Sequence, residues 1–158
     1  MQQNLIEIPN YKTVNLKHIV LDYNGTVAKD GILKEEVKKL LPLLAQTYTL
    51  HVITADTFGS VQKELQGFDV HVKVLQSQNH TLEKEAYVIE LNEYQCAAVG
   101  NGNNDEKMLQ IAEIGICLMG DEGCSTKSLL ASDITCKSIV EALELFVYPK
   151  RLIATLRV

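Results

Sequence analysis

The segment KHIVLDYNGTV, residues 17–27, is an apolar run that ends in an aspartate followed by a turn. Such a run is typical of a buried strand, so Asp22 is expected at its carboxyl end. Open α/β sheets bind their ligands outside the carboxyl ends of the strands. A second apolar run, CAAVG at 96–100, leads into the loop GNGNND at 100–105. The two segments therefore predict two strand ends that each deliver an acidic, glycine-containing loop to one site.

The rest of the chain alternates between short apolar runs and longer amphipathic stretches. The predicted strands are 18–22, 50–55, 70–75, 96–100, 114–119 and 133–136, and the predicted helices are 33–46, 58–66, 79–92, 104–113, 126–131 and 138–147. Apolar strands separated by amphipathic helices indicate a mostly parallel sheet covered on both faces. We therefore predict a doubly wound, Rossmann-like α/β fold.

Three segments are less regular. Residues 5–15 predict a short hairpin before the first strand of the sheet. Pro42 lies inside the first predicted helix, where proline causes a kink or an early end. The basic and apolar tail at 148–158 is compatible with a final helix packed across the sheet or with a contact to another subunit.

Size, charge and hydropathy argue against several classes of protein. A chain of 158 residues predicts one domain, 1–158. The net charge of -5 opposes general binding to nucleic acid or to an anionic membrane surface. No apolar stretch approaches the roughly 18 residues of a membrane span, and the first residues, MQQNLIEIPN, lack the pattern of a signal peptide. We expect a cytoplasmic enzyme.

The four cysteines form no C-x-x-C pair. Three of them, Cys96, Cys117 and Cys136, lie in apolar runs, so we predict that all four are reduced and belong to the core. A zinc site built from Cys124, Cys136 and a histidine is the less favoured alternative.

Four motifs resemble those of the haloacid dehalogenase-like (HAD) phosphotransferases. In chain order they are LDYNGTV, VITADT, a lysine at 84 and VGNGNNDEKML. Within this superfamily the chain is most similar to soluble proteins that resemble the phosphorylation domain of P-type ATPases. The resemblance covers most of the chain and implies a HAD-type fold. Only short segments separate the motifs, which leaves no room for a cap domain.

The resemblance implies a role for each motif residue. Asp22 would be the nucleophile that forms an aspartyl-phosphate, and Gly25 and Thr26 would shape the turn beside the phosphoryl group. Thr54 and its neighbour Ala55 would meet the phosphoryl oxygens, whereas Asp56 is taken as a structural helix cap.

The third and fourth motifs would supply the charges. Lys84 is the implied cation, preferred to Lys73, and Asn104 could bond a phosphoryl oxygen. A magnesium ion would be held by Asp22, Asn101, Asp105 and the backbone carbonyl of Asn24, which is the oxygen-rich shell that this ion requires.

Asn24 stands where many members of the superfamily have an aspartate that acts as general acid and base. An amide cannot carry this proton, and losing a general acid or base typically costs roughly 10² to 10⁴ in rate. We therefore predict a slow phosphatase or a stable phosphoenzyme. A catalytically weakened protein that binds a phosphorylated ligand is the alternative.

Asn101 replaces a second carboxylate and brings no charge to offset the magnesium ion. The formal charges of Asp22, Asp105, Lys84 and Mg²⁺ then leave one positive charge in excess. This predicts weaker magnesium binding and tighter phosphate binding.

Without a cap domain, the site is open to solvent. It suits a phosphate exposed on a macromolecule, or else neighbouring subunits cover it. We favour a homo-oligomer that acts on a small phosphorylated molecule.

Overall fold

The computed structural model describes residues 4–158. At its centre is a sheet of six strands in the order β10-β9-β8-β3-β6-β7, in which every neighbouring pair is parallel. The strands are β3 (His18–Asp22), β6 (Thr49–Thr54), β7 (Val70–Val74), β8 (Cys96–Gly100), β9 (Ile114–Leu118) and β10 (Ile134–Cys136).

The chain reverses its direction of winding between β3 and β8. From β3 it moves outward to β6 and β7, then returns to β8 on the other side of β3 and continues to β9 and β10. The crevice outside the carboxyl ends of β3 and β8 is therefore the topological switch point, where sheets of this type bind ligands.

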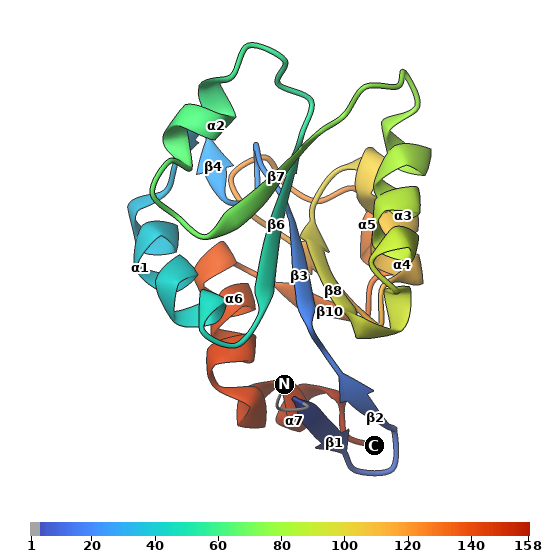
Figure 1. Ribbon diagram of the computed structural model, residues 1–158. Coiled ribbons are helices and arrows are strands. Elements are labelled where there is room, and N and C mark those ends of the chain that lie inside the picture. Colours follow the sequence, from blue (N-terminus) through green and yellow to red (C-terminus); the bar gives the residue numbers. More distant parts are fainter. Residues whose placement is uncertain (1–3) are drawn as a thin grey trace.

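Helices cover both faces of the sheet (Figure 1). One face carries α1 (Glu35–Ala45), α2 (Ser60–Glu64) and α6 (Ile139–Val147), and the other carries α3 (His80–Glu90), α4 (Glu106–Ile111) and α5 (Thr126–Ala131). Two short 3-10 helices, η1 (Glu93–Gln95) and η2 (Asn103–Asp105), flank β8.

Successive strand residues point to opposite faces, as a pleated strand requires. In β3, Ile19 and Leu21 pack into the apolar cluster on the α1 and α6 side, whereas Val20 packs into the cluster on the α3 and α4 side. All three side chains are fully buried. This two-sided burial explains the continuous apolar runs and confirms the predicted doubly wound fold.

The two ends of the chain pack together beyond the amino ends of the strands (Figure 1). Strands β1 (Leu5–Ile8) and β2 (Lys12–Asn15) form the predicted antiparallel hairpin, and α7 (Pro149–Leu156) contacts β1 and α6. Leu152 of α7 is fully buried. The tail is therefore a final helix, packed on the hairpin.

Two local features differ from simple expectation. Helix α1 runs through Pro42 to Ala45, so the proline does not end it early. A small hairpin of β4 (Ala28–Lys29) and β5 (Ile32–Leu33), which the sequence did not predict, directly follows the first motif.

Residues 4–158 contain no cap domain, as predicted. None of the helices in this part of the chain has the length and apolar character to span a bilayer.

The prediction of four reduced cysteines is wrong for Cys117 and Cys124, which form a disulfide. The chain turns back after β9 through a bridge between Gly120 and Gly123, and this reversal returns Cys124 to the side of Cys117. Cys96 and Cys136 are free and buried, as predicted. No group of three metal-ligating side chains of the His, Cys, Asp or Glu type occurs within residues 4–158, so the zinc alternative has no support there.

Reduction of this disulfide should lower the free energy of unfolding by about 2 kcal/mol, because the bond constrains a short loop of the unfolded chain. Urea unfolding with and without a reductant measures the change. Cys124→Ser should show the lower stability and lose the response to reductant, since Cys117 then has no partner and Cys96 and Cys136 are already free thiols. Equal stability of the wild type in both conditions would contradict the prediction.

A group of histidines lies across β3, β6 and β7. His51 Nε2 lies 3.0 Å from His18 Nδ1, and His51 Nδ1 lies 2.7 Å from the Tyr87 hydroxyl. The His51 ring also stacks on His71. Burial, together with the neighbouring His18 and His71, lowers the pKa of His51 from 6.5 to about 4.

We expect acid to destabilise the protein through His51. In the unfolded chain His51 becomes protonated below pH 6.5, whereas in the folded protein it stays neutral down to about pH 4. Stability that is present at neutral pH is therefore lost as the pH falls between these values. The expected loss at about pH 4.5 is about 2 kcal/mol. The measurement is urea unfolding of the wild type and of His51→Asn at neutral pH and at about pH 4.5. The same pH dependence in the variant would assign the effect to other groups.

Candidate active site

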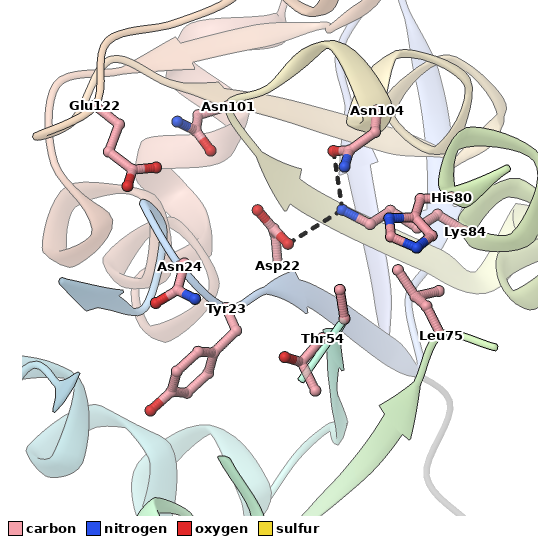
Figure 2. Close-up of a pocket in the computed structure, with 11 residues that line it drawn as sticks. Asp22, Tyr23, Asn24, Thr54, Leu75, His80, Lys84, Asn101, Asn104 and Glu122 are labelled. Atoms are coloured by element: carbon pink, nitrogen blue, oxygen red, sulfur yellow. Dashed lines mark hydrogen bonds and ion pairs between the residues drawn. The ribbon is translucent and has the colours of Figure 1, made fainter. Parts of the chain in front are cut away.

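A cavity of about 250 Å³ lies at the switch point, and residues from all four motifs line it (Figure 2). Its lining consists of Asp22, Tyr23, Asn24, Thr54, Ala55, Leu75, His80, Lys84, Asn101, Asn104 and Glu122. Seven of the predicted site residues are thus brought together from strand ends, from α3 and from η2, which lie far apart in the sequence. Three others, Gly25, Thr26 and Asp105, lie outside the lining set.

Lys84 joins the first, third and fourth motifs. Its Nζ donates to Asp22 Oδ1 at 3.1 Å, to Asn104 Oδ1 at 3.1 Å and to Asp105 Oδ1 at 2.7 Å. The side chain is buried, which by itself would lower its pKa, but the two carboxylates raise the pKa of Lys84 above its ordinary value. Lys84 therefore remains a cation beside Asp22. The competing Lys73 pairs instead with Glu83 at 3.8 Å, outside the cavity.

Asp22 stands at the end of β3 in a buried and acidic environment. Burial and the Asp105 carboxylate raise the pKa of Asp22 to about 7, and Lys84 opposes this rise. A divalent cation beside the carboxylate would favour its charged form, as nearby opposite charges do. The two carboxylates at the site face a single cation, Lys84.

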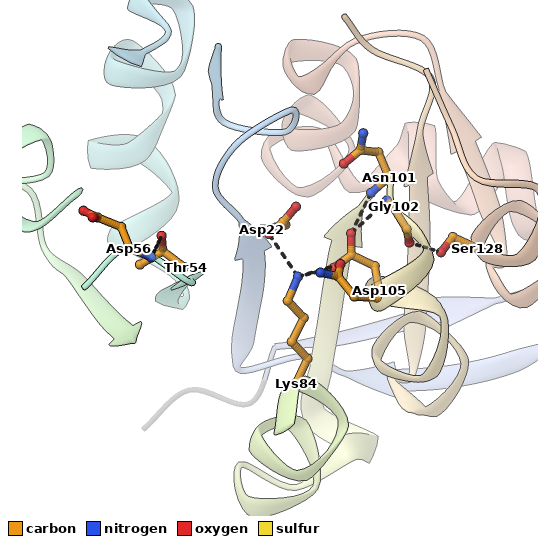
Figure 3. A network of polar contacts seen from close by, with 9 residues as sticks. Asp22, Thr54, Asp56, Lys84, Asn101, Gly102, Asp105 and Ser128 are labelled. Atoms are coloured by element: carbon orange, nitrogen blue, oxygen red, sulfur yellow. Dashed lines mark hydrogen bonds and ion pairs between the residues drawn. The ribbon is translucent and has the colours of Figure 1, made fainter. Parts of the chain in front are cut away.

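Asp105 supports the loop after β8 (Figure 3). Its Oδ2 accepts hydrogen bonds from the backbone amides of Asn101 at 2.9 Å and Gly102 at 3.0 Å, and its Oδ1 accepts from Lys84. A Cβ at residue 100 would overlap this carboxylate, so Gly100 makes the arrangement possible. The buried Ser128 hydroxyl donates to the Gly102 carbonyl and holds the loop from α5. Direct metal ligation by Asp105 stays a prediction.

Three asparagine side chains have a defined orientation at the cavity. Asn101 Nδ2 donates to the Gly123 carbonyl at 3.2 Å, which turns its Oδ1 toward Asp22 (Figure 2). Asn24 Oδ1 accepts from the Gly31 amide at 3.0 Å, and Asn104 Oδ1 accepts from Lys84. The cavity therefore receives an amide oxygen from Asn101 and N–H donors from Asn24 and Asn104.

The second motif places Thr54 and Ala55 in the cavity and Asp56 outside it. Thr54 Oγ1 accepts from the Asp56 amide at 3.0 Å, which leaves its hydroxyl hydrogen free to donate. The Asp56 carboxylate accepts from the Phe58 and Val61 amides, both at 3.0 Å. It stabilises the start of α2, the structural role predicted for it.

Gly25 and Thr26 form the turn between Asn24 and the β4–β5 hairpin. Their amides donate within this turn, from Gly25 to the Ala28 carbonyl at 2.9 Å and from Thr26 to the Tyr23 carbonyl at 3.2 Å. Gly25 has a φ of 79°, a conformation that favours glycine. Contact of either residue with a phosphoryl group stays a prediction.

Four lining residues were not predicted from the sequence. Tyr23 directly follows Asp22 in the first motif, Leu75 directly follows β7, and His80 begins α3. The fourth is Glu122, from the loop MGDEG that follows β9. This loop has the same pattern as the first and fourth motifs, a strand end followed by acidic and glycine residues. That pattern was the available signal for Glu122.

The donor set suits a hard divalent cation. Asp22 offers a carboxylate and Asn101 an oriented amide oxygen at the cavity. Ligation by the Asn24 backbone carbonyl stays a prediction. Magnesium prefers oxygen ligands and keeps several waters, so it does not need a complete protein cage. Because no three metal-ligating side chains of the His, Cys, Asp or Glu type converge within residues 4–158, amide, carbonyl and water oxygens would complete the shell.

The fold is that of HAD phosphatases. The phosphatase for 3-deoxy-D-manno-octulosonate 8-phosphate from Moraxella catarrhalis, solved with magnesium, phosphate and KDO, superimposes with a TM-score of 0.69 and 19% identity, covering 89% of this chain and 92% of that chain. The same enzyme from Yersinia pestis gives 0.69 and 10% over 97% and 96%. The cobalt-bound form from Haemophilus influenzae gives 0.69 and 9% over 84% and 87%. At these identities the likeness shows a common fold. It does not show the narrower resemblance to P-type ATPases, which stays a prediction.

Sequence comparison finds two relatives in Methanocaldococcus jannaschii. Uncharacterized protein MJ0073 is 53% identical over 60 residues, which are 38% of this chain and 64% of the relative. Uncharacterized protein MJ0072 is 46% identical over 39 residues, which are 25% of this chain and 89% of the relative. The chain belongs to the same family as MJ0072. No protein-family model matches the chain.

Proposed function

We propose that the protein is a magnesium-dependent phosphatase or phosphotransferase that works through an aspartyl-phosphate on Asp22. The observation that carries this proposal is the convergence of Asp22, Lys84, Asn101 and Asn104 on one cavity at the switch point. The HAD phosphatase fold supports it.

In the first step, the Asp22 oxygen that is not paired with Lys84 bonds to phosphorus, and the bond between phosphorus and the leaving oxygen breaks. Lys84, the Thr54 hydroxyl and the Asn104 amide are placed to balance the charge on the phosphoryl oxygens. Magnesium held by Asp22, Asn101 and the Asn24 carbonyl would add electrostatic stabilisation of that charge. Asp105 fixes Lys84 and the loop that carries Asn101.

In the second step, water attacks phosphorus and loses its proton to solvent, the bond to Asp22 breaks, and phosphate leaves. This step normally needs a base beside the phosphoryl group. Asn24 occupies the side of the cavity next to Asp22, but its amide cannot accept a proton from water. The proposed enzyme therefore forms its phosphoenzyme faster than it hydrolyses it, and it favours substrates with good leaving groups.

A catalytically weakened phospho-ligand-binding protein is the second candidate. The observation that favours it is the number of amide donors at the cavity, Asn24 and Asn104, together with the buried cation Lys84. These groups bind an anion without requiring proton transfer. For either candidate we propose a small phosphorylated ligand and a homo-oligomer that shields the open site.

Turnover of acyl phosphates and phosphate esters, measured with Mg²⁺ and with a chelator, separates the two candidates. The enzyme predicts slow, magnesium-dependent release of phosphate that is fastest for acyl phosphates. Binding of inorganic phosphate without any turnover would support the binding protein and contradict the phosphatase.

A further inference from the structure

The loop 119–125 after β9 reaches the cavity on the side of Asn101. Its Glu122 lines the cavity beside Asn101, with its carboxylate directed toward the space between Asn101, Asn24 and Asp22 (Figure 2). No hydrogen bond or ion pair engages this carboxylate within residues 4–158. Glu122 thus presents an unpaired negative charge to the site.

The first motif makes room for this side chain. A Cβ at residue 25 would overlap the Glu122 carboxylate and come within 3.1 Å of Asn101 Nδ2. The absence of a side chain at Gly25 therefore lets the Glu122 carboxylate lie directly against the turn that follows Asp22. The two loops fit together at the point where Asn24 and Asn101 lack carboxylates.

Contacts on both sides hold loop 119–125 in place. Before Glu122, Asp121 pairs with Lys34 at 2.6 Å. After it, the Gly123 carbonyl accepts from Asn101 Nδ2, and the Ser125 amide donates to the Asn101 carbonyl at 2.7 Å. The Cys117–Cys124 disulfide anchors the end of the loop to β9. These contacts fix the backbone of the loop, so Glu122 is presented beside Asn101, while its side chain is exposed and free to turn toward a cation.

We propose that Glu122 supplies the third negative charge of the metal site, in place of an aspartate at position 101. Counted with Asp22, Asp105, Lys84 and a divalent cation, Glu122 brings the formal charge of the site to zero. This removes the excess positive charge that the sequence predicted from Asn101. The inference rests on the proposed function, because it assumes that a divalent cation binds at this cavity.

The test is calorimetric titration of the wild type and Glu122→Gln with Mg²⁺ alone and, separately, with inorganic phosphate in the presence of a chelator. We expect Glu122→Gln to bind Mg²⁺ roughly 5- to 10-fold more weakly, because a negative charge near a divalent ion is lost. The same variant should bind phosphate several-fold more tightly. Opposite changes for the two ions cannot come from a general loss of structure.

Glu90→Gln is the matched control, since it removes the same charge from an exposed position of α3 outside the cavity and should change neither affinity. Glu122→Lys should weaken Mg²⁺ binding further than Glu122→Gln. If the wild type binds Mg²⁺ and Glu122→Gln binds it equally well, the inference about Glu122 is overturned and the proposed function stands. If the wild type binds no Mg²⁺, both are overturned.

Discussion

Asp22→Asn is expected to reduce phosphoryl transfer by on the order of 10³-fold or more, because an amide oxygen is a poor nucleophile toward phosphorus. The substitution keeps the size of the side chain and an oxygen that can still accept from Lys84. Asp105 still pairs with the buried Lys84 at 2.7 Å, so the variant should fold. Release of phosphate from an acyl phosphate in the presence of Mg²⁺ is the measurement.

Asp56→Asn is the matched control for this loss. Asp56 follows the neighbouring strand β6, but its carboxylate binds the backbone of the next segment and does not line the cavity. Asp56→Asn should therefore retain most of the activity in the folded fraction. Substantial phosphate release by Asp22→Asn would show that another group is the nucleophile.

Asn24→Asp is expected to accelerate hydrolysis of phosphate esters by roughly 10² to 10⁴, the usual contribution of a general acid or base. Asn24 already accepts a hydrogen bond from the Gly31 amide at 3.0 Å, and an aspartate can accept the same bond. Its second oxygen would then face the cavity beside Asp22. The gain should be larger for alkyl phosphates than for acyl phosphates, because only poor leaving groups need a proton.

Asn104→Asp adds the same charge to the cavity on the side of Lys84 and should give no such gain.

Both asparagines of interest precede a glycine, Asn24 before Gly25 and Asn101 before Gly102, and such asparagines deamidate readily. Peptide masses of each sample must therefore show intact Asn24 in the wild type. An Asn24→Asp enzyme no faster than this intact wild type would remove the role assigned to Asn24.

The sequence carried enough information to predict the fold because burial on both faces imposes a simple pattern. Each strand of a parallel sheet is apolar throughout, and each helix between strands is amphipathic. The β4–β5 hairpin escaped prediction because its two strands have only two residues each, too few to show a period.

Site residues that lie at the carboxyl end of a strand could be predicted from the sequence. Asp22, Thr54 and Asn101 meet at one cavity because parallel strands direct their carboxyl ends to the same edge, and Lys84 reaches it from α3. The partners of Asp105 were not predictable from residue type, since a carboxylate suits a metal and a pair of backbone amides equally well. In this structure the turn at 101–105 directs the Asn101 and Gly102 amides to Asp105 Oδ2.

Loop 119–125 shows the limit of reading each segment alone. Cys117 in an apolar strand is indistinguishable from a core cysteine until the chain reversal brings Cys124 beside it. The same reversal brings Glu122 to the cavity, which is the basis of the role proposed for it. The proposal that Glu122 compensates for the amide at Asn101 could therefore not be made from the fourth motif alone.

The most direct test of the central claim is intact-mass analysis of the protein after incubation with an acyl phosphate and Mg²⁺. The account predicts one added phosphoryl group, located on Asp22, that decays slowly in the wild type and faster in Asn24→Asp. A wild type with intact Asn24 that turns over the acyl phosphate rapidly, or that never carries a phosphoryl group on Asp22, would contradict it.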